Sequence, residues 1–182
     1  MPEVRQMKTC TYISGSPCVG KSTVAMAVQR SIPGIEHIRG DKYWTMYPDS
    51  KFEERVAKVN QDILAALRES GSHDVLCEWV PCRKHFAAQL HKTCAALNRR
   101  FLHVILTAPA SLLRSRKRER DGDEDIGPEI ATVPDEQNLY ECRVFDTAQE
   151  ETSRIAGEIS KWILSNQASE AIAPQCAAPH QR

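Results

Sequence analysis

The fold is decided by one stretch of sequence, Gly15-Ser16-Pro17-Cys18-Val19-Gly20-Lys21-Ser22. It matches G-x-x-x-x-G-K-[ST], the pattern of a loop that binds polyphosphates. Its two glycines permit a tight turn and a close approach to the anion, because no Cβ stands in the way. The loop N–H groups then surround the phosphates. Lys21 reaches the β- and γ-phosphates, and the Ser22 hydroxyl binds Mg²⁺.

The residues on either side of this loop supply the context that the motif requires. Residues 9–14 are rich in β-branched and aromatic side chains, which predicts a strand. Residues 22–30 predict a helix, whose N-terminal dipole would add to the attraction for phosphate. Strand, glycine loop and helix is the arrangement in which this motif binds nucleotides. We therefore predict a nucleotide-binding site here.

Length and charge restrict the class of protein. The 182 residues suffice for one domain with a sizeable core. Lys and Arg number 24 and so do Asp and Glu, a balance that disfavours nucleic acid as a partner, and no apolar run is long enough to span a membrane. The seven cysteines form no C-x-x-C pair, which predicts reduced thiols in a cytoplasmic protein. Cys18 is either an activated thiol or, as we favour, an ordinary small loop residue.

Predicted strands and helices alternate along the chain. The strands are expected at residues 9–14, 35–38, 75–79, 101–107 and 142–146, and the helices at 22–30, 51–70, 83–97, 110–120 and 147–165. This alternation predicts an α/β fold, in which helices cover both faces of a five-stranded parallel sheet. We expect one domain at residues 9–165, a flexible lead at 1–8 and a disordered tail at 166–182.

Ligands of such sheets bind at the carboxyl ends of the strands, so the residues there are the candidate site. Asp41 follows the second predicted strand. In a kinase, a carboxylate at this place orients the acceptor hydroxyl and takes its proton. The alternative role for Asp41 is a turn or helix cap; we favour catalysis because position and chemistry agree. Tyr43 and Trp44 either line an acceptor pocket or pack beneath the next helix.

The third predicted strand ends on a carboxylate, Glu78. A charge at that depth is costly unless it is paired or bound to a metal. Glu78 is therefore a candidate to hold Mg²⁺ through water or to contact the acceptor, with a solvated strand end as the alternative. Trp79 and Arg83 follow and are candidate acceptor contacts, although Arg83 equally suits the surface of a helix.

Arginines are dense on the helix predicted at residues 110–120. Arg116 and Arg120 are four residues apart and share a face. A phosphoryl-transfer site needs cations to balance the charge on the transferred group. We therefore expect these two arginines to be catalytic and residues 114–138 to form a lid over ATP. A solvated basic helix is the alternative, and the acidic residues 121–125 are read as a solvated part of the lid.

Together these motifs resemble the small P-loop kinases of the nucleoside-monophosphate-kinase-like fold, over residues 8–165. Within that fold, the chain resembles in particular the gluconate-kinase, shikimate-kinase, chloramphenicol-phosphotransferase and polynucleotide-5′-kinase-like groups. The resemblance implies strand order 2-3-1-4-5, ATP–Mg²⁺ as phosphoryl donor, a base at Asp41, lid arginines at Arg116 and Arg120, and an adenine pocket near Arg116 and Thr147. Glu78 stands where many relatives carry Asp. The implied nucleotide-binding set is Gly15, Ser16, Pro17, Cys18, Val19, Gly20, Lys21, Ser22, Thr23, Arg116 and Thr147.

Three functions fit this pattern. The first is an ATP-dependent kinase that phosphorylates a hydroxyl of a small metabolite or an antibiotic-like molecule. The second is a nucleotide or polynucleotide 5′-kinase, which needs a basic acceptor channel that the balanced charge and the acidic lid segment argue against. The third is a regulatory ATPase without an acceptor. The aromatic residues beside the predicted site favour a small-molecule pocket, and nothing in the sequence indicates an oligomeric state.

Overall fold

The structure is a computed structural model, and it describes residues 7–80, 85–122 and 141–167. Five parallel strands form one sheet in the order β2-β3-β1-β4-β5. This confirms the predicted α/β fold and its strand order. The strands are β1 (Lys8–Gly15), β2 (Glu36–Arg39), β3 (Asp74–Glu78), β4 (Arg99–Thr107) and β5 (Cys142–Asp146).

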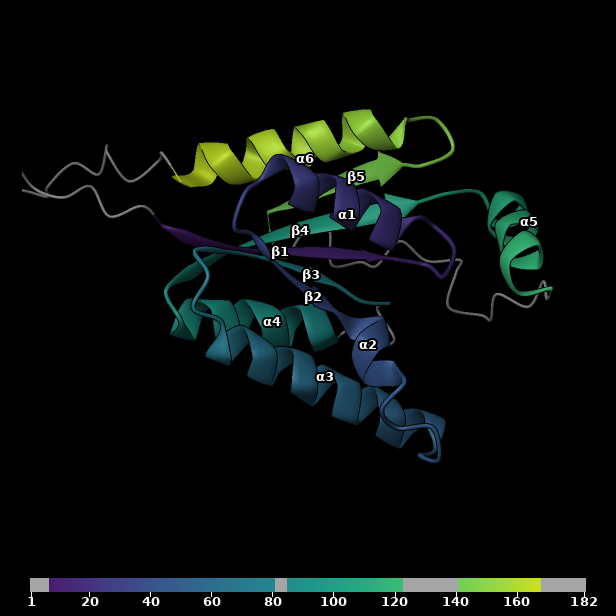
Figure 1. The fold of residues 1–182 in the computed structure, drawn as a ribbon, viewed down its shortest axis with the longest axis horizontal. Coiled ribbons are helices and arrows are strands. Elements are labelled where there is room, and N and C mark those ends of the chain that lie inside the picture. The colour runs from purple at the N-terminus through teal and green to yellow at the C-terminus, as the bar shows by residue number, and fades with distance from the viewer. Residues whose placement is uncertain (1–6, 81–84, 123–140, 168–182) are drawn as a thin grey trace, which may run out of the picture.

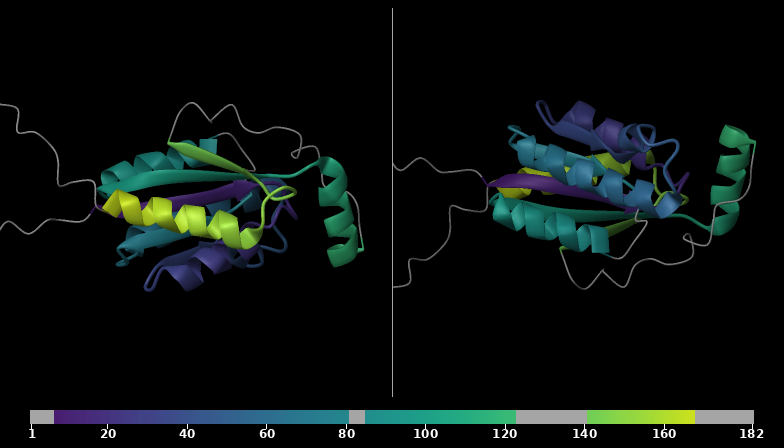
Figure 2. Two further views of the ribbon diagram at one scale, coloured as in Figure 1. Left: turned by 90° about the horizontal axis from the view of Figure 1, so that it is seen from above. Right: turned by 90° about the horizontal axis from the view of Figure 1, so that it is seen from below.

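Helices cover both faces of the sheet, as predicted (Figure 1). α1 and α6 lie on one face, and α3 and α4 lie on the other. α5 follows the end of β4 and stands apart from both layers, as the two views of Figure 2 show. The helices are α1 (Lys21–Ser31), α2 (Gly40–Trp44), α3 (Phe52–Glu69), α4 (His85–Ala96), α5 (Ala110–Asp121) and α6 (Thr152–Gln167).

The sheet separates two apolar cores. One contains Val24 and Val28 of α1 together with Ile155 and Ile159 of α6, packed against β1 and β4. The other packs α3 and α4 against the opposite face of the sheet, with Trp79 at its edge. β1 and β3 are buried along almost their whole length, because both of their faces are covered. The central strands therefore present their carboxyl ends, and the loops that follow them, as the accessible edge.

Most element boundaries fall within two residues of those predicted from the sequence. The exception is α6, which begins five residues after its predicted start, because residues 147–150 form a turn, and ends two residues beyond its predicted end. The short helix α2 was not predicted. Asp41 was expected at the end of a strand and instead lies in the first turn of α2. Residues 1–6, 123–140 and 168–182 lie outside the described residues. They include most of the predicted lead, lid and tail.

No helix among the described residues combines the length and the apolar character needed to cross a membrane.

A buried histidine lies directly beneath the phosphate-binding loop. His103 of β4 is 1% exposed, and its Nε2 lies 2.8 Å from the hydroxyl of Ser14, the residue before Gly15. The imidazole stacks on the ring of Tyr12 with centroids 5.1 Å apart. Burial lowers the pKa of His103 to about 4, because the imidazolium would be poorly solvated there. This histidine is therefore neutral in the folded protein at neutral pH.

This burial predicts an acid-sensitive fold. The unfolded chain takes up a proton at His103 near pH 6.5, whereas the folded protein does so only near pH 4. The free energy of unfolding should therefore fall as the pH drops from 6.5 to 4, by about 3 kcal/mol from this residue alone. Chemical denaturation across this pH range measures the loss, and the non-titrating variant His103→Gln should show a shallower slope. Equal slopes in the two proteins would contradict the assignment.

Candidate active site

The phosphate-binding loop joins β1 to α1 through two glycines with left-handed backbone conformations. Gly15 has φ 144°, and a Cβ at this position would lie 2.5 Å from the carbonyl oxygen of Leu106 on the neighbouring strand. Gly20 has φ 101° and precedes the first residue of α1. Side chains are disfavoured at both positions by backbone strain and, at Gly15, also by steric overlap. The motif glycines are therefore required by the path of the chain.

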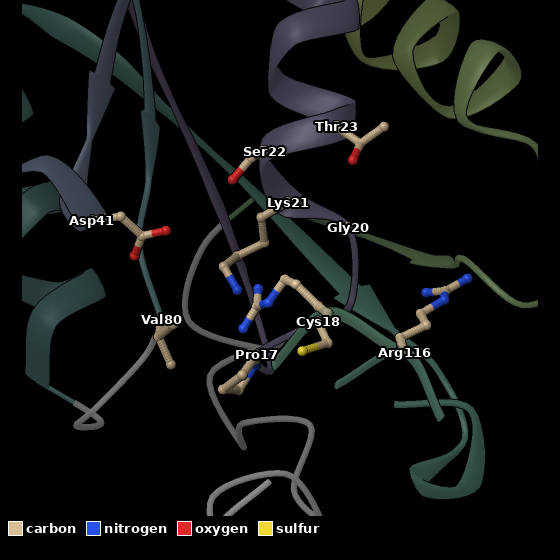
Figure 3. Close-up of a pocket in the computed structure, with 10 residues that line it drawn as sticks. Pro17, Cys18, Gly20, Lys21, Ser22, Thr23, Asp41, Val80 and Arg116 are labelled. Atoms are coloured by element: carbon tan, nitrogen blue, oxygen red, sulfur yellow. The ribbon is translucent and has the colours of Figure 1, made fainter. Parts of the chain in front are cut away.

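A cavity of about 300 Å³ opens over this loop (Figure 3). It brings together the loop, the start of α1, the start of α2, the residue after Trp79 and the basic face of α5. Val80 had not been predicted, because an aliphatic residue after a strand carries no sequence signal for a site. The lining residues are Pro17, Cys18, Gly20, Lys21, Ser22, Thr23, Asp41, Val80, Arg116 and Arg120.

Lys21 is held close to the loop. Its Nζ donates to the carbonyl oxygens of Gly15 at 3.0 Å and Ser16 at 2.8 Å. The ammonium group therefore already lies over the loop whose N–H groups would surround a phosphate. This is the position from which a lysine binds phosphate oxygens as a point charge.

Asp41 lies across the cavity from the loop, with its carboxylate toward the start of α1 (Figure 3). Its position depends on Gly40, because a Cβ at Gly40 would overlap the ring of Trp79. Trp79 is 4% exposed and donates through Nε1 to Oδ1 of Asn60 on α3 at 3.1 Å. α2 is thus packed tightly against the core just where it carries Asp41. An exposed carboxylate on a fixed backbone suits a base that must receive a hydroxyl proton.

The two predicted arginines occupy different parts of the cavity wall. Arg116 donates to the hydroxyl and the carbonyl oxygen of Thr147, each at 3.1 Å, and in Figure 3 it points away from Lys21. Thr147 itself is held at the end of β4, since its N–H donates to the carbonyl oxygen of Thr107 at 2.9 Å. The structure therefore places the two predicted adenine-pocket residues in contact.

Arg120 pairs with its neighbour on α5. Its Nε and one terminal nitrogen donate to the two carboxylate oxygens of Asp121, each at 2.7 Å. This pairing raises the pKa of Arg120. Partial burial opposes the rise, and the nearby Cys18 and Asp41 add to it. The guanidinium is thus positively charged and lies near both the loop and the predicted base.

Glu78 lies behind the loop with 4% of its surface exposed. Burial by itself raises the pKa of Glu78, but contacts with His37 and the Ser22 hydroxyl and the charge of Arg39 outweigh burial, so the pKa is lowered. Its Oε2 is buried and has no hydrogen-bond partner among the described residues. An ionised carboxylate with an unused oxygen beside Ser22 fits the oxygen-rich surroundings that Mg²⁺ prefers.

The described residues contain no group of three His, Cys, Asp or Glu side chains that could hold a metal by themselves. Magnesium ions usually keep several water ligands and bind through one or two carboxylates plus the phosphates of a nucleotide. The Ser22 and Glu78 pair fits that pattern.

The predicted aromatic acceptor contacts lie outside the cavity lining. Trp44 packs against Trp79 with ring centroids 5.9 Å apart, and the guanidinium of Arg55 lies 3.9 Å from the centre of a Trp44 ring. Tyr43 is half-buried against the same core. These contacts favour the packing alternative for Tyr43 and Trp44 and assign Trp79 to the core. Arg83 lies outside the described residues.

Because Gly40 lies against the ring of Trp79, we predict that no side chain is tolerated at position 40. Gly40→Ala should lower the free energy of unfolding by about 2 kcal/mol, because the cost of overpacking against Trp79 outweighs the better helix propensity of alanine. Gly157→Ala in α6 is the matched control: no atom lies within 4 Å of its added Cβ, so this variant should be stabilised by about 0.5–1 kcal/mol. Urea denaturation measures both values. A Gly40→Ala protein as stable as wild type would contradict the packing described for α2.

No protein-family profile matches the sequence, and no curated protein matches it. Solved structures do resemble the fold. A sugar kinase from Janibacter sp. HTCC2649 has a TM-score of 0.65 and 16% identity, over 88% of this chain and 97% of that one. The tunicamycin resistance protein of Deinococcus radiodurans has a TM-score of 0.59 and 17% identity, over 86% and 95%. A gluconokinase from Sinorhizobium meliloti 1021 has a TM-score of 0.57 and 21% identity, over 90% and 94%. The chain has the fold of the small P-loop kinases.

Proposed function

We propose that the protein is an ATP-dependent kinase that transfers the γ-phosphoryl group to a hydroxyl of a small metabolite or an antibiotic-like molecule. The observation that carries this proposal is that Asp41 faces Lys21 and Ser22 across one cavity. A phosphate-binding loop alone is common to many nucleotide-binding proteins. A carboxylate placed opposite the loop is what phosphoryl transfer to a hydroxyl also needs. The sugar kinase and the gluconokinase of similar fold support the same reading.

Each side chain has a distinct role in this proposal. Asp41 accepts the hydroxyl proton as the acceptor oxygen forms its bond to the γ-phosphorus. The bond from that phosphorus to the bridging oxygen breaks, and ADP leaves with the electron pair. Lys21 and Arg120 place positive charge where negative charge spreads over the transferred group. Arg116, held by Thr147, supports the nucleotide base at the end of β4.

Ser22 and Glu78 are suited to hold Mg²⁺, which would neutralise part of the phosphate charge when bound. The chain's own contribution is the geometry of that pair. Ser22 is placed by the first turn of α1, and Glu78 by its central strand. α1 is packed against the sheet and β3 lies within it, so both residues sit on elements of the folded core.

Replacing Asp41 tests this proposal. Asp41→Asn keeps the size of the side chain but cannot accept the proton, so acceptor-dependent ADP release should fall about 10²-fold or more. ATP affinity, measured by isothermal titration calorimetry, should stay within about twofold of wild type. Asp49→Asn, which alters an exposed carboxylate outside the cavity lining, is the matched control and should keep full activity.

The acceptor can be found with pooled candidates. Sugars and sugar acids, nucleosides, aminoglycoside- and phenicol-type antibiotics, nucleoside monophosphates and a 5′-hydroxyl oligonucleotide form separate pools. ADP release that depends on one small-molecule pool and is lost in Asp41→Asn supports the proposal. Release with the oligonucleotide, falling steeply with salt, would instead favour the polynucleotide kinase. ATP binding without turnover in any pool would favour a regulatory ATPase.

A further inference from the structure

Two side chains of β2 meet on one oxygen of Glu78. His37 and Arg39 are two residues apart, so both project from the same face of the strand. Arg39 lies directly opposite Glu78 in the sheet register. Arg39 Nε and His37 Nε2 each lie 3.3 Å from Oε1 of Glu78. The His37 contact is at ion-pair distance without the alignment of a hydrogen bond. Both of these nitrogen contacts are therefore made by Oε1 of Glu78.

The other oxygen of Glu78 is left without a partner. Oε2 is fully buried and accepts no hydrogen bond from any described residue. A buried polar atom in this state is rare in folded proteins and requires an explanation, such as an ion that completes the site. The Ser22 hydroxyl is close enough to Glu78 to lower its pKa, so the carboxylate borders the cavity residue that binds metal in this motif.

A second histidine–carboxylate pair lies at the opposite end of β3 and differs from Glu78 in that both carboxylate oxygens have partners. His73 Nδ1 lies 3.1 Å from Oδ2 of Asp74, and the other oxygen of Asp74 accepts a hydrogen bond from the Thr9 hydroxyl at 2.7 Å. Both oxygens of Asp74 are satisfied, as expected for a pair that serves the fold alone. The pair at Glu78 has the same chemistry on one oxygen and leaves the other unpaired beside the phosphate-binding loop.

We propose that His37 and Arg39 are positioning residues, which hold Oε1 of Glu78 so that Oε2 is presented to the divalent cation of the bound nucleotide. This inference rests on the proposed function in one respect, namely that the loop binds a nucleotide with its metal. Neither residue touches the nucleotide or the cation; each acts through Glu78. Side chains that orient a metal-binding carboxylate in this way typically change metal affinity 10–100-fold when they are removed.

The test measures metal binding and needs no acceptor. The probe is Mn²⁺, and electron paramagnetic resonance follows the free ion. The dissociation constant of ADP is measured in EDTA and again with saturating Mn²⁺. The ratio of the first constant to the second reports how much the metal strengthens ADP binding. His37→Leu should reduce this ratio about tenfold or more, while ADP affinity in EDTA stays unchanged. His37→Gln, which keeps a polar N–H group beside Oε1, should recover most of the ratio. His73→Leu removes the matched histidine and should leave the ratio at the wild-type value.

A second variant, Arg39→Met, tests the proposal even if the His37 variants fail to fold. The Arg39 side chain is 52% exposed, so its replacement should leave the structure intact and still reduce the ratio. Wild-type ratios in both His37→Leu and Arg39→Met would overturn the proposal, as would an equal loss in His73→Leu. An equal weakening of ADP binding with and without Mn²⁺ would also overturn it, because that is the signature of a general structural effect.

The outcome is separable from that of the kinase assay. A reduced Mn²⁺ ratio in a protein that phosphorylates no acceptor would support the role of His37 and Arg39 and refute the kinase. If the protein phosphorylates an acceptor but its His37 and Arg39 variants keep the wild-type Mn²⁺ ratio, the kinase is supported and the positioning role is refuted.

Discussion

The site depends on the close approach of β1 to β4 at Gly15. The central strand is buried on both faces and must end where a loop can turn over the sheet edge. At Gly15 the neighbouring Leu106 carbonyl leaves no room for a Cβ, and the backbone adopts a left-handed φ. Only glycine meets both conditions without strain. That single position sets where the loop leaves the sheet, and thereby where Lys21, Ser22 and the N-terminus of α1 lie.

A second packing contact places the opposite wall of the cavity. Trp79 fills the space beside Gly40 and hydrogen-bonds to α3, so α2 is packed closely against a ring that the core holds in place. Asp41 is exposed, yet the backbone that carries it is held by the core beneath. The tryptophan is therefore important to the site as a support, without lining the cavity itself. Asp41, the proposed base, and the phosphate-binding loop are each positioned by a glycine packed against a neighbouring ring or strand.

Charge is distributed unequally around the cavity. Lys21, Arg116 and Arg120 supply cations on the loop and on α5, while Asp41 supplies an anion on the side of α2. Glu78 lies outside the lining, buried at the end of β3. The arginines already have oxygen partners, in Thr147 and Asp121. Phosphate oxygens would have to compete with the Asp121 carboxylate for Arg120. Glu78 is the opposite case, since one of its oxygens has no hydrogen-bond partner in the part of the chain that the structure describes. This contrast separates the wall proposed to bind phosphate from the corner proposed to bind a cation.

The sequence by itself determined the order of strands and helices, the phosphate-binding loop and the residues at the strand ends. These follow from local periodicity and from the special backbone needs of glycine, which act over a few neighbouring residues. The short helix α2, the cavity residue Val80 and the buried role of Trp79 depend on tertiary packing. So do the pairing of Arg120 with Asp121 and the meeting of His37 and Arg39 at Glu78. β2 and β3 are separated by some 35 residues of chain, and only their pairing in the sheet brings those side chains together. Periodicity carries no information on such contacts, because they depend on which strands become neighbours.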